Sequence, residues 1–389
     1  MNEELERARV ALRGAGIDVA VLAAPSNICY VSGFESPPPI DAGWEFAEGQ
    51  PLVLLSVSDG HAILLCPDVW LRLAERANRL DDLRGYATVG FEEPVDNLAA
   101  FLDALRVALR DLGVGSGAAV VGAEYRYLPD RVGGLLRQEF PRLTSRDATA
   151  ALAEARLIKT TREIDLIRRA VAAVDAGQER LRRLCQDEAV GCTEIDLFAD
   201  VYAAVHRSAD GPAPIVGELV SGPRVGVVRY PGGPIARTVE RGDTVIQDIS
   251  ARVAGYWADC TNTLVVADAP SEGQRRYARA ARLAFEATVE TLRPEKRGGD
   301  AVESARRVFA SEGFHVTPYC GHQIGTTVNE APRLVRYDTT PIKAGMVFAV
   351  EPGVYGGEEL GVGARAEKVV VVRDDGPEIL STFTWGIDA

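Results

Sequence analysis

Apolar residues recur at two alternating spacings along the first 155 residues. Segments such as ELERARVALRGAG (residues 4–16) and AFLDALRVALRDLG (100–113) carry apolar positions three or four residues apart, which is typical of amphipathic helices. Between them lie short runs rich in Val, Ile and Leu, namely DVAVLAAP, LVLLSV, HAILLCP and AAVVGAE. Such runs are typical of strands in a sheet that is covered on both faces. The alternation predicts an α/β domain over residues 1–155.

A different pattern begins near residue 155. Thr160 is followed three residues later by Glu163, a capping box that predicts the start of a long helix. Two further helical patterns, TEIDLFADVYAAVHRSA and EGQRRYARAARLAFEATVETL, alternate with paired strand-like runs. We therefore expect a second domain, of α+β type, over residues 156–389.

The first pair of strand-like runs, GDTVIQDISARVAGYWADCTNTLVV, contains two aspartates. A loop centred between Val253 and Ala254 would set Asp248 directly opposite Asp259, with Cβ atoms roughly 4.5–5.5 Å apart. Two like charges at that distance repel, and burying them without a cation would be costly. The hairpin therefore predicts a cation between these carboxylates.

The second pair of runs, VFAVEPGVYGGEELGVGARAEKVVVV, repeats this arrangement. Glu351 ends one apolar run and Glu367 lies in the next, and a connection centred near Glu359 would let the two carboxylates face each other. His322, in the segment CGHQIG, would add one neutral nitrogen. Four carboxylates and one imidazole favour Mn, Co, Zn or Fe(II), and two such ions about 3.5–4 Å apart can polarise a carbonyl and activate water.

These segments, in this order, resemble the M24-type metallopeptidases with the pita-bread fold. GHQIG, VEPGVY and RAE carry the resemblance together with the first hairpin, while LIKTTREI and NICYVSGF narrow it to the prolidase, aminopeptidase P and creatinase branch. The resemblance implies a creatinase-like α/β N-terminal domain and a pita-bread C-terminal domain with pseudo-twofold symmetry. It also implies a homodimer.

The resemblance assigns a role to each of the five candidate ligands. Asp248 would chelate one metal ion, Asp259 and Glu367 would bridge both, and His322 with Glu351 would complete the other. In this family water activated by the two ions attacks the scissile carbon, and the glutamate at the position of Glu351 also carries a proton.

The chain departs from the family at the histidines that accompany the ligands. Arg229, Pro318 and Asn329 stand where relatives carry histidines that contact the substrate. An arginine can hold a carboxylate through forked hydrogen bonds, and an asparagine can donate to an oxyanion, but neither carries a proton as histidine does. Arg365 matches a family arginine that supports the bridging carboxylate. His206 and His315 are either displaced substitutes for the missing histidines or ordinary structural groups.

Composition and charge exclude several classes of protein. The chain has 389 residues, 47% of them hydrophobic and 25% charged, as in ordinary soluble proteins of two domains. Its net charge of -13 disfavours nucleic acid and anionic membranes as partners. Since no apolar leader or membrane-length run is present, we expect a cytoplasmic location. The six cysteines lack CxxC spacing and are expected to be reduced and mostly buried.

One segment has no periodic pattern. Residues 36–51, SPPPIDAGWEFAEGQP, combine four prolines with two aromatic residues. The segment is either a lid or dimer contact, or an ordinary surface connection.

Three functions remain open on the sequence. The leading hypothesis is a dinuclear metal-dependent hydrolase of the Xaa-Pro peptidase type, acting on a small peptide or small-molecule substrate through an altered pocket. A specialised C–N hydrolase of the creatinase or ectoine hydrolase type is the alternative, which the replaced histidines favour. A third hypothesis is an inactive binding module, against which the retention of all five candidate ligands argues.

Overall fold

The computed structural model describes residues 2–37, 49–115, 117–228, 232–357 and 359–387. The chain divides into two compact units, Met1–Leu157 and Ile158–Ala389. Most of the 36–51 segment, including both of its aromatic residues, lies outside the described residues. Within the described ranges, no helix has both the length and the apolar character that crossing a membrane requires.

The first unit is built on a mixed six-stranded sheet of order β4-β3-β2-β1-β5-β6. The β1–β5, β5–β6 and β3–β4 pairs are parallel, whereas β1–β2 and β2–β3 are antiparallel. The apolar runs predict β1, β2, β3 and β5, but β4 and β6 have mainly polar sequences that this pattern does not reveal. The strands are β1 (Val19–Leu22), β2 (Leu52–Ser56), β3 (Ala62–Pro67), β4 (Asp82–Tyr86), β5 (Ala119–Ala123) and β6 (Leu143–Asp147).

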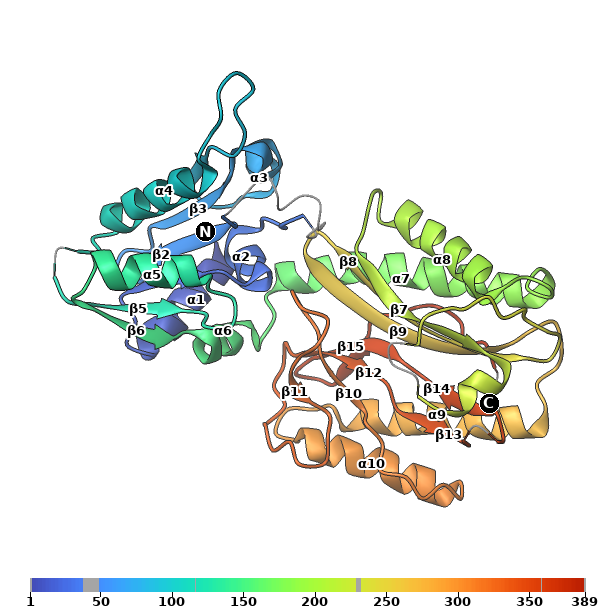
Figure 1. Ribbon diagram of the computed structural model, residues 1–389. Helices are drawn as coiled ribbons and strands as arrows, with labels where there is room; N and C mark the ends of the chain where they lie inside the picture. Colours follow the sequence, from blue (N-terminus) through green and yellow to red (C-terminus); the bar gives the residue numbers. More distant parts are fainter. Residues whose placement is uncertain (1, 38–48, 116, 229–231, 358, 388–389) are drawn as a thin grey trace. The chain divides into compact units, whose positions relative to one another are not determined.

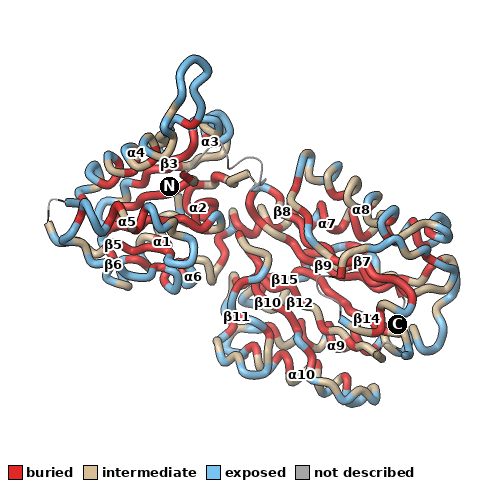
Figure 2. The backbone as a smooth tube through the Cα atoms, viewed as in Figure 1, coloured by how far each residue is buried: buried red, intermediate tan, exposed pale blue. Residues whose placement is uncertain are grey.

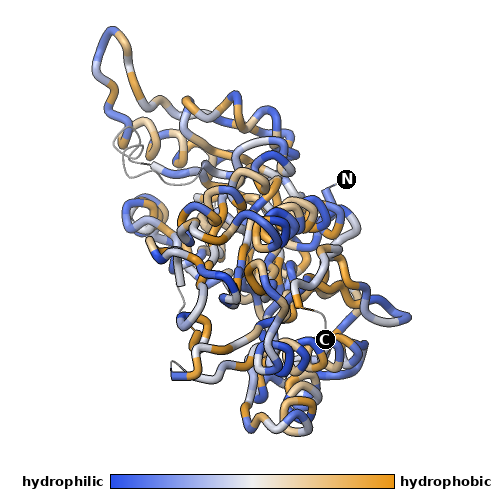
Figure 3. The backbone as a smooth tube through the Cα atoms, turned by 90° about the vertical axis from the view of Figure 1, so that its right-hand side faces the viewer, coloured by the Kyte–Doolittle hydropathy of each residue, from blue (hydrophilic) through white to orange (hydrophobic). Residues whose placement is uncertain are grey.

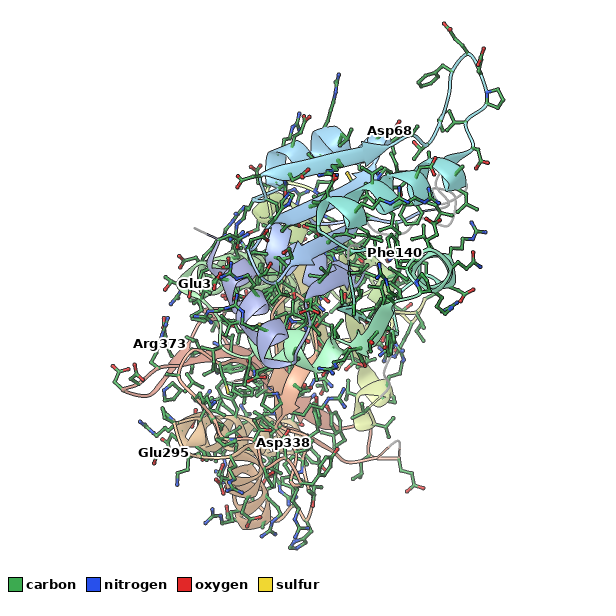
Figure 4. The ribbon with its side chains drawn as sticks, turned by 90° about the vertical axis from the view of Figure 1, so that its left-hand side faces the viewer. Glu3, Asp68, Phe140, Glu295, Asp338 and Arg373 are labelled. Carbon is green, nitrogen blue, oxygen red and sulfur yellow. The ribbon has the colours of Figure 1, made fainter. Side chains whose placement is uncertain are left out.

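Helices cover both faces of this sheet, as the unbroken apolar runs predict (Figure 1). Ala20 and Leu22 pack in a cluster with α1, α2 and α6, while Val19 and Val21 pack in another with α4 and α5. Phe140, which follows α5 and is labelled in Figure 4, belongs to the second cluster. The helices are α1 (Glu3–Gly14), α2 (Pro25–Ser32), α3 (Leu71–Ala77), α4 (Asn97–Asp111), α5 (Asp130–Glu139) and α6 (Thr149–Arg156).

The loop between β4 and α4 extends away from the sheet (Figures 1 and 3). It mixes acidic and apolar residues, and Phe91 in it is 99% exposed. At its base, the Thr88 hydroxyl donates to Asp68, a residue labelled in Figure 4.

The second unit repeats one order of elements, two helices followed by antiparallel strands. The first half forms a three-stranded sheet, β7-β8-β9, and the second half forms the sheet β11-β10-β12-β15-β16 with a separate pair, β13-β14. This is the α+β architecture in two similar halves that the resemblance implies. The first half contains α7 (Thr161–Asp187), α8 (Glu194–Ser208), β7 (Ile215–Ser221), β8 (Thr244–Val253) and β9 (Tyr256–Val265). The second half contains α9 (Glu272–Thr291), α10 (Gly298–Ser311), β10 (Gly321–Gln323), β11 (Glu330–Arg333), β12 (Val347–Val350), β13 (Gly353–Tyr355), β14 (Gly363–Arg365), β15 (Lys368–Val372) and β16 (Pro377–Ile379).

The long helix α7 begins where the capping box predicts. The Thr160 hydroxyl accepts a hydrogen bond from Glu163 N at 3.1 Å, and the Glu163 carboxylate accepts one from Thr160 N at 2.9 Å. Each bond satisfies a backbone donor that the first turn of a helix leaves free. Thr193 and Ser271 begin α8 and α9 in the same way.

The turn between β8 and β9 sets the register of the hairpin that carries both aspartates. Val253 pairs with Tyr256, so the turn consists of Ala254 and Gly255, with φ values of 49° and 83°. Two consecutive residues with positive φ are typical of the type I′ turn, whose twist matches that of the flanking strands. An alanine is strained there, because its Cβ disfavours the left-handed region.

Replacing Ala254 with Asn should therefore stabilise the protein. We expect Ala254→Asn to raise the free energy of unfolding by about 1 kcal/mol, since asparagine tolerates the left-handed region better than alanine. Urea denaturation followed by tryptophan fluorescence measures the change. Ala254→Val is the control and should lower stability; a loss of stability in the Asn variant would contradict the assigned turn.

Candidate metal centre

Asp248 and Asp259 lie on neighbouring strands and on one face of their sheet. The observed register pairs Asp248 with Thr261 and Asp259 with Ser250, so the prediction that the two aspartates are directly opposite is wrong. The turn lies one residue later than predicted, which shifts the pairing by two. An even shift leaves both carboxylates on the same face, where they are diagonal neighbours. The opposite face, which includes Ile249, packs in the core with α7.

His322, Glu351 and Glu367 lie on one face of the five-stranded sheet. His322 pairs with Ala349, and Ala349 pairs with Val369. Glu351 is two residues beyond Ala349 and Glu367 two residues before Val369, so alternation directs both to the side of His322. The β12–β15 and β13–β14 pairings are both centred on position 359, which confirms the register predicted for this connection.

Strand β9 joins the two halves of the second unit. Glu367 N donates to Thr261 O at 3.2 Å, and Trp257 N donates to Gly325 O at 2.9 Å. These bonds place the segment before β15 and the segment after β10 beside β9. The two carboxylate pairs predicted from separate hairpins therefore meet in one place, along strands that are buried in Figure 2.

The imidazole of His322 lies among the carboxylates. Its Nε2 is 3.5 Å from Glu351 Oε1 and 3.7 Å from Asp259 Oδ2. Ligand atoms of Asp259, His322 and Glu367 all lie within 4.8 Å of one another. Nδ1 of His322 lies 2.9 Å from the carbonyl oxygen of Gln323, which accepts its proton and leaves the lone pair of Nε2 directed at the cluster.

Three carboxylate oxygens in this cluster are buried without a hydrogen bond from the described residues. They are Oδ1 of Asp248, Oδ1 of Asp259 and Oε1 of Glu367. A buried anionic oxygen without a partner carries a large desolvation cost, which a divalent cation would remove. The set of hard oxygens with one imidazole therefore fits Mn, Co, Zn or Fe(II).

Arg365 is buried and donates hydrogen bonds to Asp248 and to three neighbouring side chains, those of Thr261, Tyr355 and Glu218. Its Nη2 donates to Asp248 Oδ2 at 2.8 Å, its Nε to Thr261 Oγ1 at 3.0 Å, and its Nη1 to the Tyr355 hydroxyl at 3.1 Å. Thr261 in turn donates to Glu367 Oε2 at 2.6 Å. Arg365 thus contacts Asp248 directly and reaches Glu367 through Thr261.

Burial and mutual repulsion raise the pKa values of the four carboxyl groups. Burial, then the charge of Glu351, raises the pKa of Asp259 to about 6. Burial raises the pKa of Glu351 to about 7, although His322 and Arg365 oppose the shift. The pKa values of Asp248 and Glu367 lie well above the ordinary range, because of burial and the neighbouring Asp259. Each group therefore binds protons readily when no cation is present.

The residues predicted to replace the family histidines are only partly described. Arg229 lies outside the described residues. Pro318 is buried, whereas Asn329 is exposed and accepts a hydrogen bond from Arg333 Nε at 3.2 Å. His315 is exposed; His206, at the end of α8, accepts a bond from Ala213 N at 3.1 Å, as a structural group does.

The structure adds neighbours of the site that the sequence pattern does not reveal. Glu218 on β7 is buried and pairs with Arg365, and its only signal in the sequence is an acidic residue inside the apolar run IVGELVS. Thr261 follows Asp259 by two residues, a spacing that places both on one face of a strand. Lys159, also buried, donates to Gln323 at 2.7 Å and to Glu330 at 3.1 Å, which fixes the strand that carries His322.

Comparison with known proteins gives two family matches. The model described as metallopeptidase family M24 matches residues 165–374, and the creatinase/prolidase N-terminal domain matches residues 4–158.

Individual relatives agree with these matches. "Probable dipeptidase PepE" of Mycobacterium tuberculosis (strain H37Rv) is 33% identical over 236 residues, 59% of this chain and 60% of that protein. The chain thus spans three fifths of the length of this curated relative. An Xaa-Pro dipeptidase of Pyrococcus furiosus is 25% identical over 98% of both chains. The crystal structure of the prolidase from Pyrococcus horikoshii OT3 superimposes with a TM-score of 0.79 over 100% of both chains at 21% identity, a likeness of fold.

The raised pKa values predict how the stability of the cation-free protein depends on pH. Folded Asp259 and Glu351 hold their protons up to about pH 6 and 7, whereas in an unfolded chain they lose them near pH 4. Between these values the folded state binds more protons, so stability is present at low pH and is lost as pH rises through the window. From these two groups together we expect the cation-free protein to lose roughly 5 kcal/mol of unfolding free energy between pH 4.5 and 7.5.

The difference between the wild type and an Asp259→Asn/Glu351→Gln variant isolates this contribution. Urea denaturation of both cation-free proteins across the pH range measures the difference in unfolding free energy. Parallel pH profiles for the two proteins would show that these carboxyl groups do not titrate in the predicted window.

Proposed function

This chain belongs to the metallopeptidase family M24, and from that premise we propose that it is a dinuclear metal-dependent hydrolase of the Xaa-Pro peptidase type. The observation that carries the proposal is the grouping of Asp259, His322 and Glu367, together with carboxylate oxygens of Asp248, Asp259 and Glu367 that are buried without a hydrogen bond from the described residues. Residues 156–389 would form the catalytic domain and residues 1–155 a creatinase-like N-terminal domain, in keeping with the two family matches.

Five side chains would hold two divalent cations in this proposal. They are Asp248, Asp259, His322, Glu351 and Glu367. When bound, the cations would polarise the scissile carbonyl and lower the pKa of water so that it attacks at neutral pH. Manganese, cobalt, zinc and iron(II) all suit this donor set.

The remaining groups of the site would orient the ligands and move protons. The Nδ1 proton of His322 is held by Gln323 O, so Nε2 stays free to bind. Arg365 and Thr261 fix Asp248 and Glu367 through hydrogen bonds. Glu351, whose Oε1 lies 3.5 Å from His322 Nε2, would carry a proton from the attacking water to the leaving amine, the role that the family resemblance gives to this position.

The substrate in this proposal is a small peptide with an Xaa-Pro bond or a related amide. Arg229 would hold the substrate carboxylate and Asn329 would donate to the oxyanion, in place of the family histidines. These replacements also favour a second candidate, a C–N hydrolase of the creatinase or ectoine hydrolase type. We further propose a cytoplasmic homodimer, in keeping with the family resemblance.

Removing the cations should abolish activity without unfolding the protein. We expect dialysis against a chelator to lower hydrolysis of Xaa-Pro dipeptides by at least about a hundredfold, because a bound cation is what lowers the pKa of the attacking water toward neutrality. Adding Mn²⁺ or Co²⁺ back should restore it, as a coupled assay for released amino acid would show. Full activity in protein shown by elemental analysis to hold no metal would contradict the proposal.

Returning a histidine to position 329 should separate the two candidate functions. If the site cleaves Xaa-Pro bonds, Asn329→His should raise kcat/KM for these dipeptides at least about tenfold, because histidine can transfer a proton at working pH. Asn329→Gln is the matched control, which keeps the amide. Wild-type turnover of cyclic amidines or guanidino acids, with none of dipeptides, would favour the second candidate.

A further inference from the structure

Glu218 is an acidic residue beside the candidate metal centre for which the five-ligand site has no role. It lies on β7, where it pairs directly with Asp248 on β8. Residues paired across an antiparallel ladder point to the same face, so Glu218 shares the face of Asp248 and Asp259. It is 4% exposed.

One nitrogen of Arg365 serves both Glu218 and Asp248. Nη2 donates to Glu218 Oε1 and, at 2.8 Å, to Asp248 Oδ2. The other two nitrogens of the guanidinium donate to Thr261 and Tyr355. The geometry therefore divides the two N–H groups of Nη2 between a candidate ligand and a carboxylate outside the ligand set.

This division decides how strongly Arg365 competes with a cation for the oxygens of Asp248. An arginine that faces one carboxylate can donate to both of its oxygens through a forked pair of hydrogen bonds. Here Asp248 gives Oδ2 to Arg365 while Oδ1 is buried without a hydrogen bond from the described residues. Oε2 of Glu218 is likewise buried without such a bond. Glu218 thus offsets the charge of Arg365 and adds negative charge next to Asp248.

We propose that Glu218 is a positioning residue for metal binding: it shares Arg365 with Asp248 and so leaves Asp248 Oδ1 available to a divalent cation. Without the charge of Glu218, Arg365 would pair more fully with Asp248, and the cation held there would bind more weakly. The inference rests on the proposed function, since it assumes that Asp248 binds a cation.

The alternative is that Glu218 and Arg365 form an ion pair that only holds the fold together. The chain offers a matched control for this case in Glu194, which is fully buried, pairs with Arg224 and lies at the start of α8. Replacing either glutamate with glutamine removes the charge from a buried carboxylate–arginine pair. The arginine of the Glu218 pair also donates to a candidate ligand, Asp248.

The test is a calorimetric titration of Mn²⁺ into the full chain, after a chelator has removed bound cations and has itself been dialysed away. We expect wild type to bind two ions per chain, and Glu218→Gln to weaken the binding of one of them by roughly tenfold. Glu218→Asp, which keeps the charge, should recover part of the affinity, and Glu194→Gln should bind Mn²⁺ like wild type. Thermal unfolding of each chelated variant shows whether it is folded before titration.

The outcomes distinguish this inference from the proposed function. Wild type that binds no Mn²⁺ would overturn both. Wild type that binds two ions, with Glu218→Gln binding them at unchanged affinity, would overturn the role of Glu218 alone. Equal weakening in Glu218→Gln and Glu194→Gln would also overturn it, because lost stability would then explain the effect.

Discussion

The second unit is organised around like charges buried together. Asp259, Glu351 and Glu367 lie around His322 and Asp248 lies beside Asp259, and three of the carboxylate oxygens have no hydrogen bond from the described residues. Carboxylates in this setting must bind protons or cations, because neither repulsion nor desolvation is otherwise offset. The surrounding contacts follow from this constraint: Arg365 neutralises part of the charge, and Thr261 and Gln323 fix the ligands in orientation.

Strand β9 lets two separate hairpins supply one site. One edge of β9 pairs with β8, and its other neighbours are the segments that carry His322 and Glu367. The helices pack on the opposite face of the β8–β9 hairpin, so the polar face is free to carry aspartates and threonines while the core stays apolar. The repeated order of helices and strands thus brings residues more than a hundred positions apart into contact.

The sequence predicts features that depend on local rules. The capping box at Thr160 and the covered strands of the first unit were predicted correctly, as was the pairing centred on residue 359. The predicted pairing of Asp248 with Asp259 differs from the observed register by two residues. Ala254 and Gly255 form the turn with positive φ values, which the hydrophobic pattern does not reveal. Glu218 was missed, since only the pairing of β7 with β8 shows which acid lies beside Asp248. The strands β4 and β6 are mainly polar, with only one or two apolar residues each, too few to show a strand pattern.

The central claim is that divalent cations, and not protons, balance these buried carboxylates. A crystal structure of protein grown with Mn²⁺, with diffraction recorded on both sides of the manganese absorption edge, tests it most directly. We expect two anomalous peaks per chain, bonded to oxygens of Asp248, Asp259, Glu351 and Glu367 and to Nε2 of His322. Absence of anomalous density at this cluster, with the carboxyl groups hydrogen-bonded to one another, would contradict the claim.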